Sequence, residues 1–142
     1  MPEAITAGRE VLEFELGPET YCVDIEYVEE IVETGTLTEI PNSPSYVKGV
    51  MDLRGRTTTI IDPTTVLDLS HEASGDRIII FDPEQMEDTG AVGWVVDGAD
   101  RVVRVEEERI EDAAPTDDAA INGVIKHDDE FVIYVDPTAI ES

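Results

Sequence analysis

The chain has 142 residues, a mass of 15.6 kDa and 41% hydrophobic residues, which is enough for one domain with its own buried core. It carries one cysteine, so no disulfide can form within it. Thirty-four acidic residues against nine lysines and arginines give a formal net charge of −25. Such a charge repels phosphate groups, which makes nucleic acid and anionic lipid poor partners.

The acidic residues are spread along the chain instead of being gathered in a tail, and the lysines are only Lys48 and Lys126. Molar salt shortens the screening length to about 3 Å, so an acidic surface of this kind suits a protein that works in concentrated salt. The first ten residues show no signal-peptide pattern, and no stretch approaches the roughly 20 apolar residues of a membrane helix. We therefore expect a salt-adapted, soluble and cytoplasmic protein with no direct membrane insertion, whose acidity reports habitat more than function.

Apolar residues that alternate with polar ones, and β-branched runs, predict an all-β chain. Leu12, Phe14 and Leu16 alternate with glutamates, and a turn at 17–18 leads to a second strand at 21–25. The apolar residues Ile25, Val28, Ile31 and Val32 instead fall at helical spacing, and Asp24 precedes them as an N-cap, which predicts a short helix. Further along we expect a hairpin of residues 47–53 and 56–62 around Arg54-Gly55, a short helix at 63–69, a polar linker at 70–76, strands near 77–82, 91–97 and 100–105, an acidic loop at 106–120 and a hairpin at 123–135.

The sequence also repeats itself. Gly49-Val50-Met51 and Ile61-Asp62-Pro63-Thr64 recur 74 residues later as Gly123-Val124-Ile125 and Val135-Asp136-Pro137-Thr138, and Tyr21-Cys22-Val23-Asp24 matches Trp94-Val95-Val96-Asp97 at an offset of 73. The repeat predicts two related halves, 10–70 and 76–142, each a unit of about five strands, after an N-terminal tail at 1–9. Units this small bury little surface alone, so we expect them to pack over a shared core and to leave a groove for a partner at their seam.

Evidence for catalysis is weak. Asp88-Thr89-Gly90-Ala91 matches the motif of retroviral-type aspartic proteases, whose chemistry needs two aspartates that share a proton. The chain has no second Asp-Thr-Gly, so a turn between strands explains the motif better, and a dimeric protease that uses Asp88 is a remote alternative. His71 and His127 show no zinc-ligand spacing, and EF-hand and phosphate-binding glycine motifs are absent from the sequence. We expect no catalytic residue, metal or cofactor.

Two features favour a docking surface. Among the four apolar residues at helical spacing, Ile25 and Val32 are expected in the core, whereas the spacing does not decide whether Val28 and Ile31 lie in the core or on the surface. The predicted turn Leu53-Arg54-Gly55-Arg56 places two of the nine cations at one hairpin tip. Arginine there fits either a solvated turn or an anchor for a carboxylate of a partner.

Several segments together carry a family pattern. They are 11–17 with 21–25, Val28-Glu29-Glu30-Ile31, the stretch from Pro44 to Arg56 with Ile60-Ile61-Asp62, and, in the second half, 92–97, 123–125 and 131–136. Over roughly residues 10–140 the chain resembles the CheW family of chemotaxis coupling proteins. It departs from the family pattern at Asp52, Thr59 and Pro63, where asparagine, proline and leucine are usual.

The resemblance implies a single CheW-like domain over 10–142, built as two SH3-like five-stranded β-barrels packed on a shared core, with short helices and no catalytic activity. It implies a scaffold that links the cytoplasmic tip of chemoreceptors to the regulatory domain of the histidine kinase CheA, here in a halophilic archaeon. A CheW-like adaptor in a different receptor–kinase pathway is the alternative.

The resemblance also implies which residues meet each partner. The receptor set is Leu12, Val28, Glu30, Ile31, Ala99 and Val102. The kinase set is Ile40, Pro41, Met51, Leu53 and Arg54. From the receptor set we expect Val28→Asp to weaken receptor binding while leaving thermal stability nearly unchanged.

Overall fold

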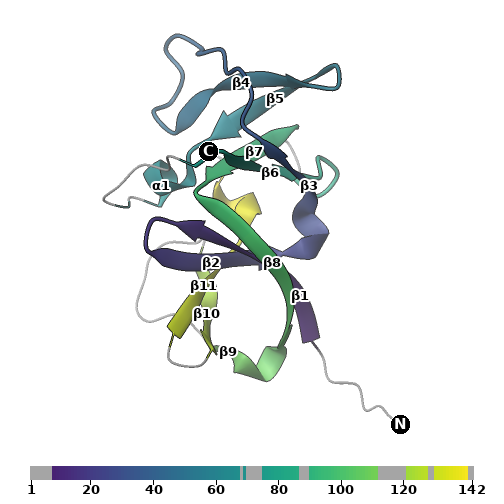
Figure 1. Ribbon diagram of the computed structural model, residues 1–142, viewed down its shortest axis with the longest axis vertical. Coiled ribbons are helices and arrows are strands. Elements are labelled where there is room, and N and C mark those ends of the chain that lie inside the picture. The colour runs from purple at the N-terminus through teal and green to yellow at the C-terminus, as the bar shows by residue number, and fades with distance from the viewer. Residues whose placement is uncertain are drawn as a thin grey trace.

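The computed structural model describes residues 8–67, 69, 75–86, 90–111, 121–127 and 130–140, the side chains of Asp100, His127 and Ile140 excepted. Its strands form two sheets, which lie one above the other in Figure 1. Sheet A has the strand order β8-β1-β2-β11-β10-β9, and sheet B has the order β3-β6-β7-β5-β4. Within the described residues no helix is long and apolar enough to cross a membrane.

Sheet A consists of β1 (Gly8–Leu16), β2 (Glu19–Asp24), β8 (Gly98–Glu106), the two-residue β9 (Ile110–Glu111), β10 (Ile121–His127) and β11 (Glu130–Val135). Sheet B consists of β3 (Val28–Glu33), β4 (Val47–Leu53), β5 (Arg56–Ile61), β6 (Arg77–Phe81) and β7 (Val92–Val96). The helical segments are short: η1 (Ile25–Tyr27), α1 (Pro63–Val66), η2 (Glu107–Arg109) and η3 (Pro137–Ile140).

The two sheets share one core, as the sequence predicts. Phe14 of β1 and Phe81 of β6 both contact the Trp94 ring edge-to-face, with ring centroids 6.0 and 4.8 Å apart. Each sheet also curls around a core of its own, with Ile60 and Ile78 in the sheet B barrel and Val11 and Val132 in the sheet A barrel. The prediction of two SH3-like barrels packed on a common core is confirmed, with β9 as a sixth strand in sheet A.

The division between the barrels, however, is not the predicted division between the halves 10–70 and 76–142. Sheet A combines β1 and β2 of the first half with β8 to β11 of the second, whereas sheet B combines β3 to β5 with β6 and β7. The first half therefore gives its opening hairpin to sheet A and takes up β6 and β7 from the second half in exchange. Sequence self-similarity reveals which strands are related but not which of them pair.

The repeat at an offset of 74 corresponds to real structural equivalence. In the β4–β5 and β10–β11 hairpins the register shifts just before Gly49 and Gly123, and an added Cβ at either glycine would lie within 2.5 Å of a backbone oxygen. The match at an offset of 73 is wrong in register. Cys22 pairs with Tyr134 in β11, and Gly93 pairs with Ile60 in β5, so β2 and β7 are related at an offset of 71.

The predicted helix between residues 25 and 32 is also wrong. Only η1 is helical, and the chain then continues as the strand β3. Asp24 makes no capping hydrogen bond. Ile25 packs against the shared core and Val32 against the sheet B core, as expected, although both are only partly buried.

Candidate functional site

A β-bulge in β3 explains why the sequence looks helical there. Val28 pairs with Phe81 and Ile31 pairs with Ile79, and the register shifts between Val28 and Glu30. Phe81 and Ile79 both belong to the shared core, so Val28 and Ile31 lie on the face of sheet B that turns toward sheet A. A bulge inserts one extra residue, and so two residues three apart share a face of the strand, as they would on a helix.

Strand β8 repeats this arrangement on sheet A. Ala99 pairs with Phe14 and Val102 with Leu12, and the register shifts between these two pairs. Because Phe14 and Leu12 belong to the shared core, Ala99 and Val102 lie on the face that turns toward sheet B. Val28 therefore corresponds to Ala99, and Ile31 to Val102, again at an offset of 71.

Four apolar residues thus occupy equivalent positions on two edge strands, and we call them the edge-strand patch: Val28, Ile31, Ala99 and Val102. Val28 and Ala99 pack against the shared core, whereas the residues Ile31 and Val102 are 40% and 49% exposed. Strands β3 and β8 each end their sheet, and β8 also contacts β6, the neighbour of β3 (Figure 1). The patch thus follows the boundary between the two barrels.

The other two members of the receptor set lie elsewhere. Leu12 is only 2% exposed and lies in the shared core, paired with Val102, so it supports the patch from below. Glu30 pairs with Ile80 of the sheet B core and forms an ion pair with Arg54. The structure therefore joins Glu30 of the receptor set to Arg54 of the kinase set.

This ion pair ties β3 to the β4–β5 turn. Arg54 and Gly55 have φ angles of 52° and 84°, the left-handed values that a two-residue hairpin turn of type I′ requires. The predicted hairpin is confirmed, and its tip turns back toward β3, where Arg56 also bonds Glu29 at 3.3 Å. Both arginines at this tip are thus engaged by glutamates of the same chain.

The kinase set divides into exposed and buried members. Ile40 is 44% exposed and Pro41 is exposed, and Ile40 lines a hollow of about 390 Å³ together with Lys48 and Asp62. Met51 and Leu53 are each 9% exposed and belong to the sheet B core. These two side chains shape the barrel, and Ile40, Pro41 and Arg54 are the exposed members of the set.

Comparison with known proteins agrees with this geometry. The sequence pattern of the CheW-like domain matches residues 10–142. The chain belongs to the CheW family. It is 30% identical to the chemotaxis protein CheW of Bacillus subtilis over an alignment of 146 positions, gaps included, which covers 99% of this chain and 91% of the relative. It is 29% identical to the CheW protein of Thermotoga maritima, over 89% of this chain and 83% of that one. The crystal structure of the scaffolding protein TtCheW from Thermoanaerobacter tengcongensis superimposes with a TM-score of 0.80 at 28% identity, over 90% of this chain and 88% of that one.

Sequence reasoning missed two features of this CheW-family chain, an exposed phenylalanine and a cavity. Phe131 of β11 is 55% exposed, the largest exposure among the large apolar side chains described, although it lies in a run that reads as buried strand. The interior of the sheet A barrel contains a cavity that no motif announces. Alternation within β11 is the one signal that could have placed Phe131 outside, because its neighbour Val132 is buried.

Asp88 of the protease-like motif lies outside the described residues.

Proposed function

We propose that this CheW-family chain is a non-enzymatic adaptor that couples chemoreceptors to a CheA-type histidine kinase in chemotaxis. The observation that carries the proposal is the family match over residues 10–142, together with an apolar patch on the boundary of the two barrels. An adaptor needs two surfaces and no reactive group. The exposed members of the receptor and kinase sets supply two such surfaces.

The edge-strand patch is the proposed receptor surface, and its occupant is the cytoplasmic tip of a chemoreceptor. Ile31 and Val102 are the residues there that combine an apolar side chain with large exposure. Concentrated salt leaves intact the binding free energy that comes from burying apolar area, whereas it screens charge steering within about 3 Å at 1 M. Hence we expect these two side chains to dominate the affinity.

The proposed kinase surface lies on sheet B, at Ile40, Pro41 and the Arg54 turn, and its occupant is the regulatory domain of the kinase. Arg54 is the anchor best suited to a carboxylate, since its side chain is 65% exposed despite the ion pair with Glu30. A receptor that bound near Glu30 would lie close to this anchor. The two partners would then meet on neighbouring faces of one small protein, which would work in the cytoplasm beside receptor arrays.

The test is assembly of a ternary complex. A receptor signalling fragment, the kinase regulatory domain and this chain are mixed at molar salt, and complex size is followed by light scattering. Coupling predicts a complex of all three that requires this chain. Ile31→Asp should remove the receptor from the complex and keep the kinase domain, and Phe131→Asp serves as a matched control that keeps both. Binding to neither partner would contradict the proposal and favour an adaptor of a different receptor–kinase pathway.

We further propose that the acidity is an adaptation to concentrated salt, as in a halophilic archaeon. Exposed glutamates along β3 and around η2 place part of the net charge of −25 on the surface. Mutual repulsion among them weakens with screening, so the melting temperature should rise steeply between about 0.1 and 2 M potassium chloride. A melting temperature that stays constant over this range would contradict the adaptation.

A further inference from the structure

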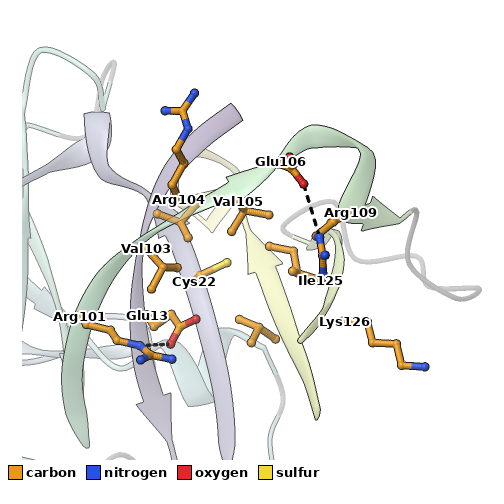
Figure 2. Close-up of a pocket in the computed structure, with 12 residues that line it drawn as sticks. Glu13, Cys22, Arg101, Val103, Arg104, Val105, Glu106, Arg109, Ile125 and Lys126 are labelled. Atoms are coloured by element: carbon orange, nitrogen blue, oxygen red, sulfur yellow. Dashed lines mark hydrogen bonds and ion pairs between the residues drawn. The ribbon is translucent and has the colours of Figure 1, made fainter. Parts of the chain in front are cut away.

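The sheet A barrel is not completely filled. A cavity of about 290 Å³ opens into it between β8, β10 and the β1–β2 hairpin (Figure 2). Its apolar wall comprises six side chains of the sheet A core: Val11, Cys22, Val103, Val105, Ile125 and Val132. An apolar cavity of about 150 Å³ is already large enough to bind benzene, so this one can take a small organic molecule.

Side-chain size explains why this barrel has room. The sheet B barrel is filled by long side chains, among them Met51, Leu53 and three isoleucines. Valines and one cysteine line much of the sheet A barrel instead. Glu13 pairs with Arg101 in sheet A, and the equivalent pair in sheet B is Ile80 with Glu30. A carboxylate of sheet A therefore takes the place of a buried isoleucine of sheet B.

The charges around the cavity reverse the composition of the chain. Arg101, Arg104, Arg109 and Lys126 line it, which is four of the nine cations of the sequence, against only two of its 34 acidic residues, Glu13 and Glu106. In Figure 2 the head groups of Arg104 and Lys126 point away from the cavity, so they add positive potential but would not touch a ligand inside it. The lining itself carries four cations against two carboxylates, whereas Glu108 and Glu111 line an adjoining hollow with Arg109 and Lys126. On a protein of net charge −25, this local excess favours an anion at the cavity over the rest of the surface.

Arg101 and Arg109 each lie beside a carboxylate of the cavity lining, and Arg109 is the better anchor. Arg101 donates from Nε to Glu13 Oε1 at 3.3 Å, and the side chain of Glu13 is only 12% exposed. Taking Arg101 away would leave a buried carboxylate without its counter-charge, which is costly. Arg109 lies 3.6 Å from Glu106, whose side chain is 46% exposed and can return to water. A ligand can therefore displace Glu106 at little cost.

We propose that this cavity binds a small amphiphilic anion, with its apolar body inside the sheet A barrel and its carboxylate, sulfonate or phosphate group beside Arg109. The site is separate from the edge-strand patch, because Val103 faces the barrel interior whereas its neighbour Val102 faces outward. The proposal is therefore independent of the proposed adaptor function. Free organic acids and anionic lipids share this chemistry, and the experiment below separates them.

The test compares decanoate, below its micelle concentration, with uncharged decanol by calorimetric titration and methyl NMR shifts of the whole protein. Decanoate should bind saturably, with shifts at Val103, Val105 and Ile125. Arg109→Gln should weaken decanoate about 3- to 10-fold, the worth of one charge-assisted contact near water, and leave decanol unchanged. Arg77→Gln removes an equally charged side chain from sheet B, 41% exposed and likewise paired with carboxylates, and should change neither ligand.

A second variant tests the cavity itself. Val103→Phe fills the space and should abolish binding of both ligands while circular dichroism shows a folded protein. If that variant fails to fold, the Arg109→Gln comparison decides alone. No saturable binding of decanoate, or equal affinities of the wild type and Arg109→Gln, would overturn the proposal. Cosedimentation with phosphatidylglycerol vesicles without binding of free decanoate would also overturn it, in favour of a membrane-surface contact.

Discussion

The Tyr134 hydroxyl donates a hydrogen bond of 2.6 Å to Asp24 Oδ2 and thereby joins β11 to the last residue of β2. Asp24 is 7% exposed and also accepts a bond of 3.3 Å from Arg9. This carboxylate is thus used in the sheet A barrel, which explains why it caps no helix. Burial raises the pKa of Tyr134, and its hydrogen bond to Asp24 raises it further.

Replacing Tyr134 by Phe should lower the free energy of unfolding by about 1–3 kcal/mol at pH 7, because a buried acceptor loses a donor. The pKa of Tyr134 is higher in the folded than in the unfolded state, so its contribution is complete below about pH 10 and is lost as the pH rises beyond that. The difference between wild type and Tyr134→Phe should therefore shrink above pH 10. Urea denaturation of both proteins between pH 7 and 11 measures it. A difference that stays constant to pH 11 would contradict the assignment.

The repeated Asp-Pro-Thr turns offer an internal comparison. Asp62 accepts from the backbone nitrogen and the hydroxyl of Thr64 at 2.9 and 2.6 Å, and Asp136 accepts from Thr138 at the same two distances. Asp62 is 3% exposed, whereas Asp136 is half-buried. Asp62→Ala should therefore cost about 1–2 kcal/mol of stability and Asp136→Ala less, because water can replace the lost acceptor there. Equal costs in denaturant unfolding would show that burial does not govern these caps.

Local chemistry is what the sequence predicts well. The hairpin at Arg54-Gly55 follows from turn residues, and the core strands follow from alternation and β-branched runs. The helix at Ile25 to Val32 fails because a bulge in a strand and a turn of helix both place residues three apart on one face.

The sequence does not predict long-range features of the fold, for a different reason. Which half supplies the neighbour of β1 depends on pairing between distant strands, and a repeat shows only that two strands are alike. The receptor set shows the same limit. The family resemblance assigns Leu12 and Val102 to the receptor set alike, but only the fold shows that Leu12 is buried beneath Val102.

The structure separates two substitutions within the edge-strand patch. Val28 packs against the shared core, so Val28→Asp should now lower the melting temperature as well as receptor binding. Ile31 is 40% exposed, and Ile31→Asp should weaken receptor binding at least tenfold with little change in melting temperature. Thermal melts and receptor-fragment titrations at molar salt test both. Full receptor affinity in folded Ile31→Asp would exclude the patch as the receptor surface.

The turn residue Arg54 can be tested without disturbing the hairpin. Its φ of 52° lies in the left-handed region, which asparagine tolerates better than arginine. Arg54→Asn should therefore change stability little, because the relief at positive φ offsets the loss of the ion pair with Glu30, in which the Arg54 side chain is 65% exposed and the Glu30 side chain 26%. Affinity for the kinase regulatory domain should fall several-fold while receptor affinity is kept. An unchanged kinase affinity would remove Arg54 from the kinase surface.

The exchange of strands between the halves predicts how the protein behaves when it is cut. β1 and β2 need β8 and β11 as neighbours, and β6 and β7 need β3 and β5, so neither half contains a complete sheet. Fragments 1–72 and 73–142, expressed separately, should each lack a cooperative thermal transition at molar salt. Mixed at equal concentration, they should regain the β-sheet circular dichroism spectrum and melt at a temperature that rises with fragment concentration, because folding is then bimolecular. A cooperative transition in either fragment alone would mean that each half folds as an independent unit, and the pairing of β1 with β8 would then be needed only to join them.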